Sequence, residues 1–129
     1  MTRVVMGLLF DTHGNILIAK RNFHKKYGGL WEFPGGKIEQ EETIEEALAR
    51  EIFEEMNAPI KIKHVYSSYI FQYDNLKAEF IPVSGSITPA DIRLNEHEDF
   101  KFITIEEIGR FDFSPYDYEA IEMLEARQI

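Results

Sequence analysis

The chain has 129 residues, 44% of them hydrophobic and 13% aromatic, which is the size of one ordinary domain with a proper core. A formal net charge of −9 excludes the basic surface that polymeric nucleic acid requires, and the absence of cysteine excludes disulfides, thiol catalysis and cysteine-ligated zinc or iron–sulfur sites. No apolar run approaches the ~20 residues of a membrane span, and no cleavage site follows the first residues. We therefore expect a single domain over residues 1–129, cytoplasmic, with no membrane or nucleic acid polymer as partner.

Strands are predicted in both halves of the chain. Gly14 lies in the turn of a first hairpin, and Asp74-Asn75 lies in the turn of a second hairpin. A polar loop is expected over residues 84–91. The predicted strands are residues 3–10, 15–20, 60–73, 77–83 and 100–103.

One helix is predicted from Thr43 to about Met56. Thr43 and Glu46 have the spacing of a capping box, which marks a helix start. Asn57 suits the left-handed position just after the helix, where Gly is commonest and Asn is the usual substitute.

Two further helices are predicted near the C-terminus. Thr104 is expected to cap a short one, and Ser114 is expected to cap a closing helix with Pro115 in its first turn. The apolar residues of the closing helix, spaced to face inward, are Ala120, Ile121 and Leu124. Because strands outnumber these helices and interleave with them, the sequence predicts an α+β domain with a mixed sheet between helices.

Three carboxylates crowd one side of the first helix. Glu51, Glu54 and Glu55 have the spacing i, i+3, i+4, and they continue the apolar stripe that begins at Ile44 and Leu48. Partial burial of ionised carboxylates is costly unless they are paired or bind a metal, and a hard cation such as Mg²⁺ removes that cost. The alternative is a solvated acidic face.

The segment before this helix favours the metal interpretation. Residues 30–37 read Leu-Trp-Glu-Phe-Pro-Gly-Gly-Lys, a short apolar strand broken by Pro-Gly-Gly. Gly35 has no side chain, so its carbonyl can come close to a metal held by the glutamates. Loop and helix are therefore expected to form one site.

Residues 36–58 read Gly-(five residues)-Glu-(seven residues)-Arg-Glu-Ile-Phe-Glu-Glu-Met-Asn-Ala. This pattern resembles the Nudix box, the loop–helix signature of Nudix hydrolases, and departs from it at Asn57, where the signature has Gly, and at the small Ala58. The preceding Trp-Glu-Phe-Pro-Gly-Gly-Lys resembles the MutT-like branch of that family. The resemblance implies the Nudix α/β/α sandwich with a mixed β-sheet between helices.

The resemblance also implies an activity. Nudix hydrolases cleave a nucleoside diphosphate linked to a further group, and the MutT-like branch converts nucleoside triphosphates to a monophosphate and pyrophosphate. The implied cofactor is Mg²⁺, with Mn²⁺ as the alternative. Glu51, Glu54 and Glu55 are the implied catalytic residues, and Glu51 is also a candidate general base, since crowding can raise the pKa of a carboxyl. The implied metal ligands are Gly35 through its carbonyl, Glu51, Glu54, Glu55 and Glu96.

Glu96 comes from a distant loop in which His97, Glu98 and Asp99 are further candidates. Glu96 is preferred by analogy with MutT-like proteins, and an ordinary polar loop is the alternative. His97 is interpreted as ordinary loop surface.

Three residues of the box are assigned structural roles, namely Gly36, Glu42 and Arg50. Arg50 is expected to point to another side of the helix from the three glutamates. There it would pair with Glu42 or Glu45 and hold the loop against the helix.

Substrate contacts must come from outside the box. Arg21 and Lys37 are candidates for phosphate binding, Arg through its fork and Lys as a point charge. Phe33 and Tyr73 are candidates for stacking on a base, with core packing as the alternative. Lys25 and its neighbour Lys26 are expected on a mobile solvated loop.

Asp117 is the candidate for recognition of the base. Residues 113–117 resemble the segment from which MutT-like enzymes present an Asn or Asp to the edge of a purine or pyrimidine. A carboxylate accepts hydrogen bonds and a protonated carboxyl can also donate one, so its state would influence which base is preferred. The alternative is a first-turn helix acid favoured by the helix dipole.

Several alternatives stay open from the sequence. The substrate is an oxidised, methylated, cytidine or guanine triphosphate, or another nucleoside diphosphate derivative such as ADP-ribose or a dinucleoside polyphosphate. A non-catalytic nucleotide-binding Nudix module is the alternative from a different functional class. The protein is expected to be a monomer or a homodimer.

Overall fold

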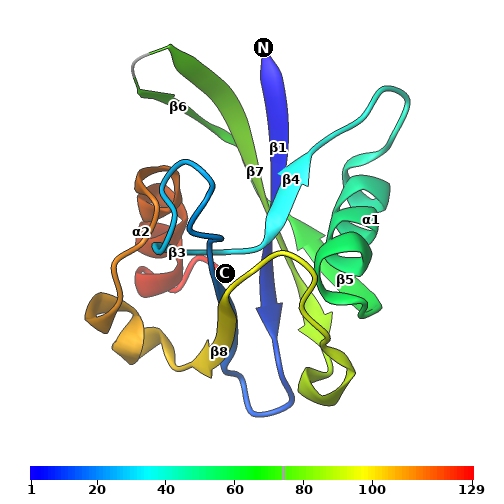
Figure 1. Cartoon of the computed structure of the whole chain (residues 1–129), viewed down its shortest axis with the longest axis vertical. Helices are drawn as coiled ribbons and strands as arrows, with labels where there is room; N and C mark the ends of the chain where they lie inside the picture. The colour runs from blue at the N-terminus through cyan, green and yellow to red at the C-terminus, as the bar shows by residue number, and fades with distance from the viewer. Residues whose placement is uncertain (74) are drawn as a thin grey trace.

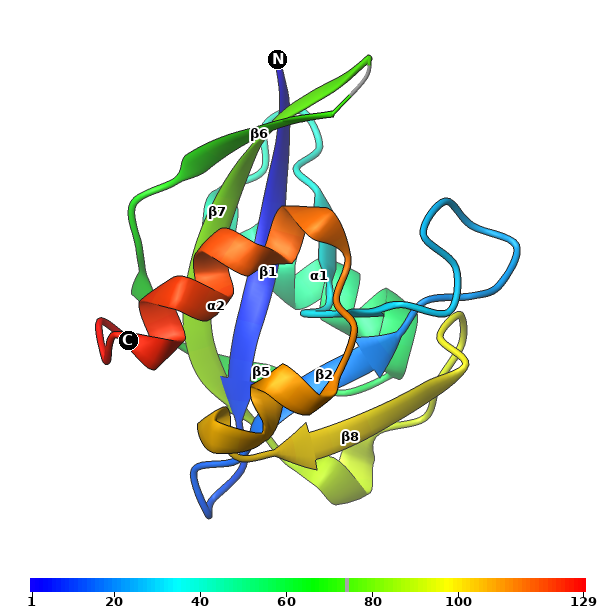
Figure 2. The same cartoon turned by 90° about the vertical axis from the view of Figure 1, so that its left-hand side faces the viewer.

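The computed structural model describes residues 1–73 and 75–129, apart from the side chains of Tyr73 and Leu76. A mixed sheet lies between helix α1 (Ile44–Met56) and helix α2 (Tyr118–Glu125), which cover opposite faces of it (Figures 1 and 2). The predicted α+β sandwich is therefore confirmed. The predicted turn residue Asp74 and the Tyr73 side chain lie outside the described part of the chain.

The sheet is built around two long parallel strands. Its strands are β1 (Thr2–Phe10), β2 (Ile16–Lys20), β3 (Trp31–Glu32), β4 (Gly35–Lys37), β5 (Ile60–Val65), β6 (Tyr69–Tyr73), β7 (Leu76–Ile87) and β8 (Asp99–Ile103). Their order is β3-β2-β1-β7-β5, while β4 pairs with β1, β6 with β7 and β8 with β2. Only the β1–β7 pairing is parallel among the described strands.

Strand alternation divides the core into two layers. Along β1, Val5 and Leu9 pack toward α1, whereas Met6 and Leu8 pack on the side of α2, as expected for side chains that alternate between the faces of a sheet. All four are at most 2% exposed. Both faces of β1 are thus buried, which explains why this stretch is almost continuously apolar.

The ends of α1 agree with the prediction. Thr43 N–H donates to Glu46 and Glu46 N–H donates to the Thr43 hydroxyl, at 2.9 and 3.0 Å, which completes the capping box. Asn57 has φ 57° and ψ 24°, the left-handed conformation that ends the helix, and its side chain donates to the Arg93 carbonyl at 2.7 Å. The replacement of Gly by Asn therefore preserves the helix end.

Two expectations for the middle of the chain are wrong. The predicted strand 60–73 is two strands, β5 and β6, which pair with opposite ends of β7. The predicted polar loop 84–91 is strand as far as Ile87, because these residues pair with β1 on one side and β5 on the other. Ladder hydrogen bonds on both edges outweigh the low strand propensity of Ser-Gly-Ser at this point.

The C-terminal region is more broken than predicted. Thr104 caps a 3₁₀ helix, Ile105–Arg110, through a capping box with Glu107. The Ser114 side chain makes no capping hydrogen bond, because Pro115–Asp117 forms a separate 3₁₀ turn before α2 begins at Tyr118. The inward-facing residues Ala120, Ile121 and Leu124 are buried as predicted. Within residues 1–73 and 75–129, no helix has the length and apolar character needed to cross a bilayer.

Candidate active site

Glycine brings the loop against the helix. Gly36 in β4 pairs with Val5, and a Cβ atom at Gly36 would overlap the Glu51 carboxylate of α1. A Cβ atom at Gly35 would overlap the Val5 carbonyl group on the other side. Only residues without a side chain allow β4 to fit between β1 and α1, so the loop lies against the helix as predicted.

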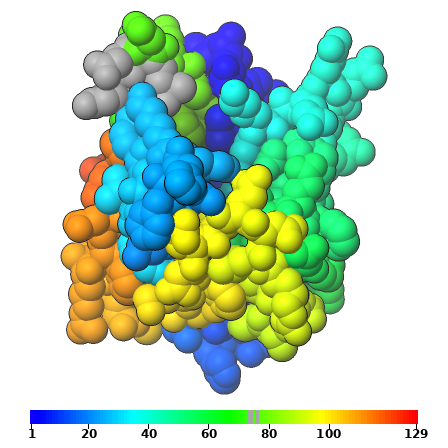
Figure 3. Space-filling view, in the orientation of Figure 1, coloured from blue at the N-terminus to red at the C-terminus, as the bar shows by residue number. Residues whose placement is uncertain are grey.

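A cavity of about 410 Å³ opens beside this contact. In Figure 3, the light blue segment before β3 and the yellow segment before β8 meet at the surface beside it. The predicted site residues that line the cavity are Arg21, Phe33, Gly35, Gly36, Lys37, Glu51, Glu55, Glu96 and Asp117. Those that do not line it are Glu42, Arg50 and Glu54.

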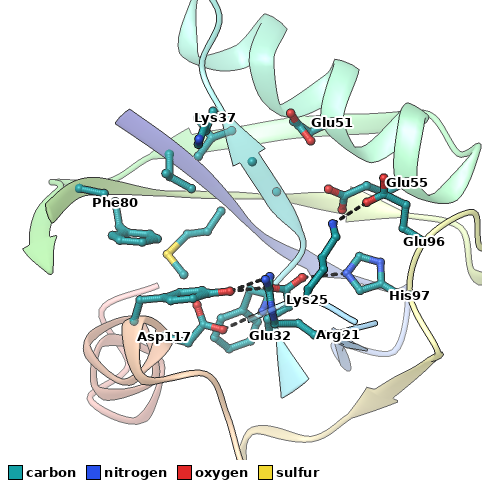
Figure 4. Close-up of a pocket in the computed structure, with 18 of the residues that line it drawn as sticks. Arg21, Lys25, Glu32, Lys37, Glu51, Glu55, Phe80, Glu96, His97 and Asp117 are labelled. Carbon is teal, nitrogen blue, oxygen red and sulfur yellow. Dashed lines mark hydrogen bonds and ion pairs between the residues drawn. The ribbon is translucent and has the colours of Figure 1, made fainter. Parts of the chain in front are cut away.

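The acidic side of the cavity contains Glu51, Glu55 and Glu96 (Figure 4). Glu55 is 8% exposed, and its Oε1 atom is buried without a hydrogen-bond partner. Burial, together with the charges of Glu32 and Glu51, raises the pKa of Glu55 to about 10. A carboxyl in these surroundings lacks a cation, and a bound metal ion would supply one.

The donor set fits a hard divalent ion, since carboxylate and carbonyl oxygens are the ligands that Mg²⁺ and Mn²⁺ prefer. In the described part of the chain, no three acidic, His or Cys side chains converge as a preformed metal site. Two of the carboxylates are paired with protein cations instead, since Arg50 binds Glu51 at 3.0 Å and Lys25 binds Glu96 at 2.9 Å. These carboxylates are paired with side chains that an ion would replace.

Arg50 connects the loop to the helix. Its guanidinium group donates twice to Glu42, at 2.6 and 2.9 Å, and once to the Lys37 carbonyl at 3.0 Å. The predicted pairing with Glu42 is confirmed, and it lowers the pKa of the Glu42 carboxyl. The expectation that Arg50 points away from the glutamates is wrong, because the same group donates to Glu51 and Glu54 at 3.0 and 3.2 Å. A long side chain with five donors can serve both sides of the helix.

Glu54 lies apart from the cavity. Its side chain is 56% exposed and contacts Arg50. The Glu54 backbone carbonyl accepts a hydrogen bond from Asn95 at 2.7 Å, one residue before Glu96. The assignment of Glu54 to the metal stays a prediction, as does the assignment of Glu51 as general base.

Asp117 lies at the opposite side of the cavity from α1 (Figure 4). It is fully buried, its Oδ2 accepts from the Phe33 N–H at 3.1 Å, and its Oδ1 has no hydrogen-bond partner. Burial and the charge of Glu32 raise the pKa of Asp117 well above its usual range. Asp117 occupies the N-cap position of α2, as the helix-acid alternative expects, but its side chain makes no capping hydrogen bond and lines the cavity; recognition of a base by Asp117 stays a prediction.

Phe33 packs in the core and also lines the cavity, so core packing does not exclude stacking on a base. The ring is 3% exposed and packs against Phe113 with ring centroids 5.3 Å apart, so it belongs to the core. It also lines the cavity, and its backbone holds Asp117. Stacking of a base on Phe33 stays a prediction.

A buried network on the cavity wall was missed by the sequence analysis. Glu32 accepts from Arg21 at 2.8 Å, from the Tyr116 hydroxyl at 2.7 Å, and pairs with His97 Nε2 at 2.8 Å. Burial acts to raise the pKa of Glu32, but the hydrogen bond with His97 and the charge of Arg21 outweigh it and lower this pKa. The available signal was an acidic residue between Trp31 and Phe33 in a short apolar strand.

Two loop assignments change as a consequence. His97 is not loop surface, because its side chain is only 5% exposed and is bonded to Glu32. Arg21 lines the cavity, but its guanidinium group already donates to Glu32, Tyr116 and the Lys26 carbonyl. Phosphate binding by Arg21 and by Lys37, which also lines the cavity, stays a prediction.

A known protein family matches the part of the chain that forms this site. The NUDIX domain family matches residues 1–124. The CTP pyrophosphohydrolase of Escherichia coli (strain K12) is 27% identical over 122 residues, 92% of this chain and 87% of that protein. An 8-oxo-dGTP diphosphatase from Proteus vulgaris is 46% identical over 57 residues, 44% of this chain and only 51% of the relative's length.

Among solved structures, the MutT protein from Methanosarcina mazei Go1 superposes with a TM-score of 0.87. The match covers 98% of this chain and 94% of that one at 24% identity, which supports the fold. The family match extends over nearly the whole chain and includes the loop–helix site described above. The chain therefore belongs to the Nudix hydrolase family.

Proposed function

We propose that this Nudix hydrolase cleaves a nucleoside triphosphate to a nucleoside monophosphate and pyrophosphate, with Mg²⁺ or Mn²⁺ as cofactor. The observation that carries the proposal is the composition of one cavity (Figure 4). Glu51, Glu55 and Glu96 lie on one side of it and the buried carboxyl of Asp117 on the other. Such a cavity suits a ligand with a metal-bound phosphate chain at one end and a base at the other.

The acidic side would carry out the hydrolysis. Glu51, Glu54, Glu55, Glu96 and the Gly35 carbonyl would hold the ion, and a divalent ion bound there would supply Lewis-acid polarisation of the phosphate oxygens. In this proposal Glu51 accepts the proton of the attacking water. The water oxygen bonds to one of the two phosphorus atoms that flank the α,β bridging oxygen, the bond from that phosphorus to the bridging oxygen breaks, and the monophosphate and pyrophosphate separate.

The chain's other residues would orient these groups. Arg50 would remain bonded to Glu42 when the ion takes Glu51 from it, and would so keep the loop against the helix. Lys37 presents a cation to the cavity from β4, where it would contact the phosphate chain as a point charge. Arg21 would add a second contact to the phosphate chain, which is constrained because its guanidinium group is already bonded to Glu32 and Tyr116.

Asp117 would read the base. A neutral carboxyl has one O–H donor and one acceptor, so it complements a base edge on which an acceptor lies next to a donor. Cytosine presents such an edge at N3 and its amino group, and guanine presents one at O6 and N1–H. The guanine edge with two adjacent donors, N1–H and the amino group, fits an ionised carboxylate instead.

Cytidine triphosphates and oxidised guanine triphosphates are therefore the first candidate substrates. The names of the Escherichia coli CTP pyrophosphohydrolase and the Proteus vulgaris 8-oxo-dGTP diphosphatase support these two classes. A location in the cytoplasm and a monomeric or homodimeric state remain part of the proposal.

A substrate panel tests the proposal. Purified protein with Mg²⁺ is given CTP, dCTP, 5-methyl-dCTP, dGTP, 8-oxo-dGTP, ADP-ribose and a dinucleoside polyphosphate, and the products are separated. We expect pyrophosphate and a monophosphate from a triphosphate, at the highest kcat/KM for a cytidine or oxidised guanine nucleotide. Faster cleavage of ADP-ribose or the dinucleoside polyphosphate contradicts it, and tight binding without turnover identifies a non-catalytic module.

A further inference from the structure

An ion pair with no assigned role lies in the cavity. Lys25 Nζ is 2.9 Å from Glu96 Oε2, and both side chains are about half exposed. Both residues line the cavity together with Glu51 and Glu55, and Lys25 reaches Glu96 from the opposite side to α1 (Figure 4). Lys25 lies on an exposed loop, as expected, but its ammonium group is paired and does not simply face solvent.

The loop that carries Lys25 is ordered by its own hydrogen bonds. The Lys25 N–H donates to the Asn22 carbonyl at 3.0 Å, and the Gly28 N–H donates to the Lys25 carbonyl at 2.9 Å. A Cβ atom at Gly28 would lie 2.6 Å from the Phe23 carbonyl oxygen, so the turn requires glycine. These backbone contacts thus fix the position of the Lys25 main chain, from which its side chain extends.

The same loop is also bonded to the segment that carries Glu96. The Asn22 side chain donates to the Glu96 carbonyl at 3.2 Å, and the Phe23 N–H donates to Glu98 Oε2 at 3.2 Å. With the ion pair, three contacts join the two segments. The lysine is thereby held beside Glu96 even when its ammonium group has another partner.

A lysine in this place competes with a metal ion. The ammonium group of Lys25 and a divalent cation would compete for the Glu96 carboxylate. The divalent ion carries twice the charge and should displace the exposed ammonium group. The displaced ammonium group can still reach the cavity, because Lys25 lines it and the Lys25 backbone is held by the loop's hydrogen bonds. The anion available there is the phosphate chain of the substrate.

We propose that Lys25 is a further substrate-binding residue, whose ammonium group pairs with Glu96 in the metal-free protein and passes to the phosphate chain when a divalent ion takes Glu96. The inference rests on the proposed function for the identity of the anion. It assigns to one side chain two effects of opposite sign, weaker metal binding without nucleotide and tighter nucleotide binding with metal.

The first measurement is Mn²⁺ binding without nucleotide, followed by electron paramagnetic resonance. Lys25→Met removes the competing cation and keeps the side-chain length, so we expect Mn²⁺ to bind about two- to fivefold more tightly, in keeping with an exposed pair. Lys26→Met is the matched control, because the Lys26 ammonium lies over the Tyr27 ring and outside the cavity lining. Its Mn²⁺ affinity should equal that of the wild type.

The second measurement is binding of a nonhydrolysable α,β-methylene analogue of CTP with Mg²⁺, together with steady-state kinetics. In Lys25→Met we expect about tenfold weaker analogue binding and a similar rise in KM, with kcat within twofold of wild type. Lys25→Arg restores a cation and should restore most of the affinity. Lys26→Met should again behave as wild type.

Unchanged or weaker Mn²⁺ binding in Lys25→Met overturns the proposal, and so does unchanged affinity for the analogue. The proposed function fails separately, if the wild type hydrolyses no triphosphate in the substrate panel. In that case the Mn²⁺ and analogue affinities of Lys25→Met still decide the role of Lys25.

Discussion

Glu32 Oε2 lies 2.8 Å from His97 Nε2, which joins strand β3 to the segment that carries Glu96 across 65 residues of sequence. The other oxygen of Glu32 accepts a hydrogen bond from the hydroxyl group of Tyr116, the residue before Asp117. A single buried carboxylate therefore connects the metal side of the cavity with its base side. The relative position of the two sides depends on Glu32.

Removal of Glu32 should destabilise the fold strongly. Glu32→Ala leaves the Arg21 guanidinium, whose side chain is 18% exposed, without its carboxylate partner. Loss of one partner from a buried ion pair costs about 3 kcal/mol or more, so we expect that decrease in the free energy of unfolding. Urea denaturation measures it. Glu32→Gln keeps acceptor and shape and should lose less, and equal, small losses in both variants would contradict the assignment.

Substitution of Glu54 should lower turnover strongly and change the stability of the fold little. Its carboxylate is more than half exposed, so Glu54→Gln should change the free energy of unfolding by no more than about 0.5 kcal/mol. If Glu54 leaves Arg50 to bind the ion, the same substitution lowers turnover by about 100-fold or more. Glu45→Gln, an exposed change in the first turn of the same helix, is the control and should retain activity. Unchanged turnover in Glu54→Gln would remove Glu54 from the metal site.

Glu55 should make the metal-free protein less stable as the pH rises. Folded Glu55 keeps its proton up to about pH 10, whereas the unfolded chain loses it near pH 4.5. Between these values the folded state binds more protons, so the contribution of Glu55 to stability is present at acidic pH and declines toward alkaline pH. The metal ion replaces that proton, so Mg²⁺ should raise the melting temperature more at pH 8 than at pH 6.

Glu55→Gln cannot ionise and should lose this dependence. At pH 8 with a chelator, we expect it to melt about 5 °C above the wild type, and Mg²⁺ should stabilise it far less. Differential scanning fluorimetry across pH 5–9 measures both effects. Parallel curves of melting temperature against pH for the two proteins would show that Glu55 is not the responsible group.

The parts of the fold that the sequence predicted are those with local signals. The capping box of Thr43 and Glu46 and the left-handed Asn57 lie within a few residues of the structure that they determine, so α1 was found to within one residue. Gly36 belongs here as well, because the contact that it permits lies within the same loop–helix unit.

The parts that were missed depend on partners distant in sequence. The break between β5 and β6 is set by their pairing with two ends of β7, and Ser67-Ser68 between them is only a weak local turn signal. Glu32 and His97 read as unremarkable until the fold brings them together. The ion pair of Lys25 with Glu96 was missed for the same reason, since the two residues are 71 apart in the sequence.

Asp117 should govern both the affinity for the base and its pH dependence. Asp117→Asn keeps a donor and an acceptor at every pH, whereas the wild-type carboxyl loses its donor when it ionises. For a cytidine triphosphate, whose base edge needs the neutral carboxyl, the KM of the wild type should therefore rise as the pH increases through the raised pKa of Asp117, and the KM of Asp117→Asn should stay constant. Steady-state kinetics from pH 6 to 10 test this. The ratio of the two KM values at each pH removes the effect of pH on the substrate itself, because both proteins meet the same substrate.

Asp117→Ala separates this role from a structural one. It leaves the Phe33 N–H without its acceptor and should cost about 1–3 kcal/mol of stability, whereas the amide oxygen of Asp117→Asn retains that bond. If Asp117 contacts the base, Asp117→Ala also raises KM by about tenfold or more at every pH and weakens discrimination between bases, while kcat changes less. A variant that is destabilised yet keeps the KM and base preference of the wild type would limit Asp117 to holding Phe33 in place.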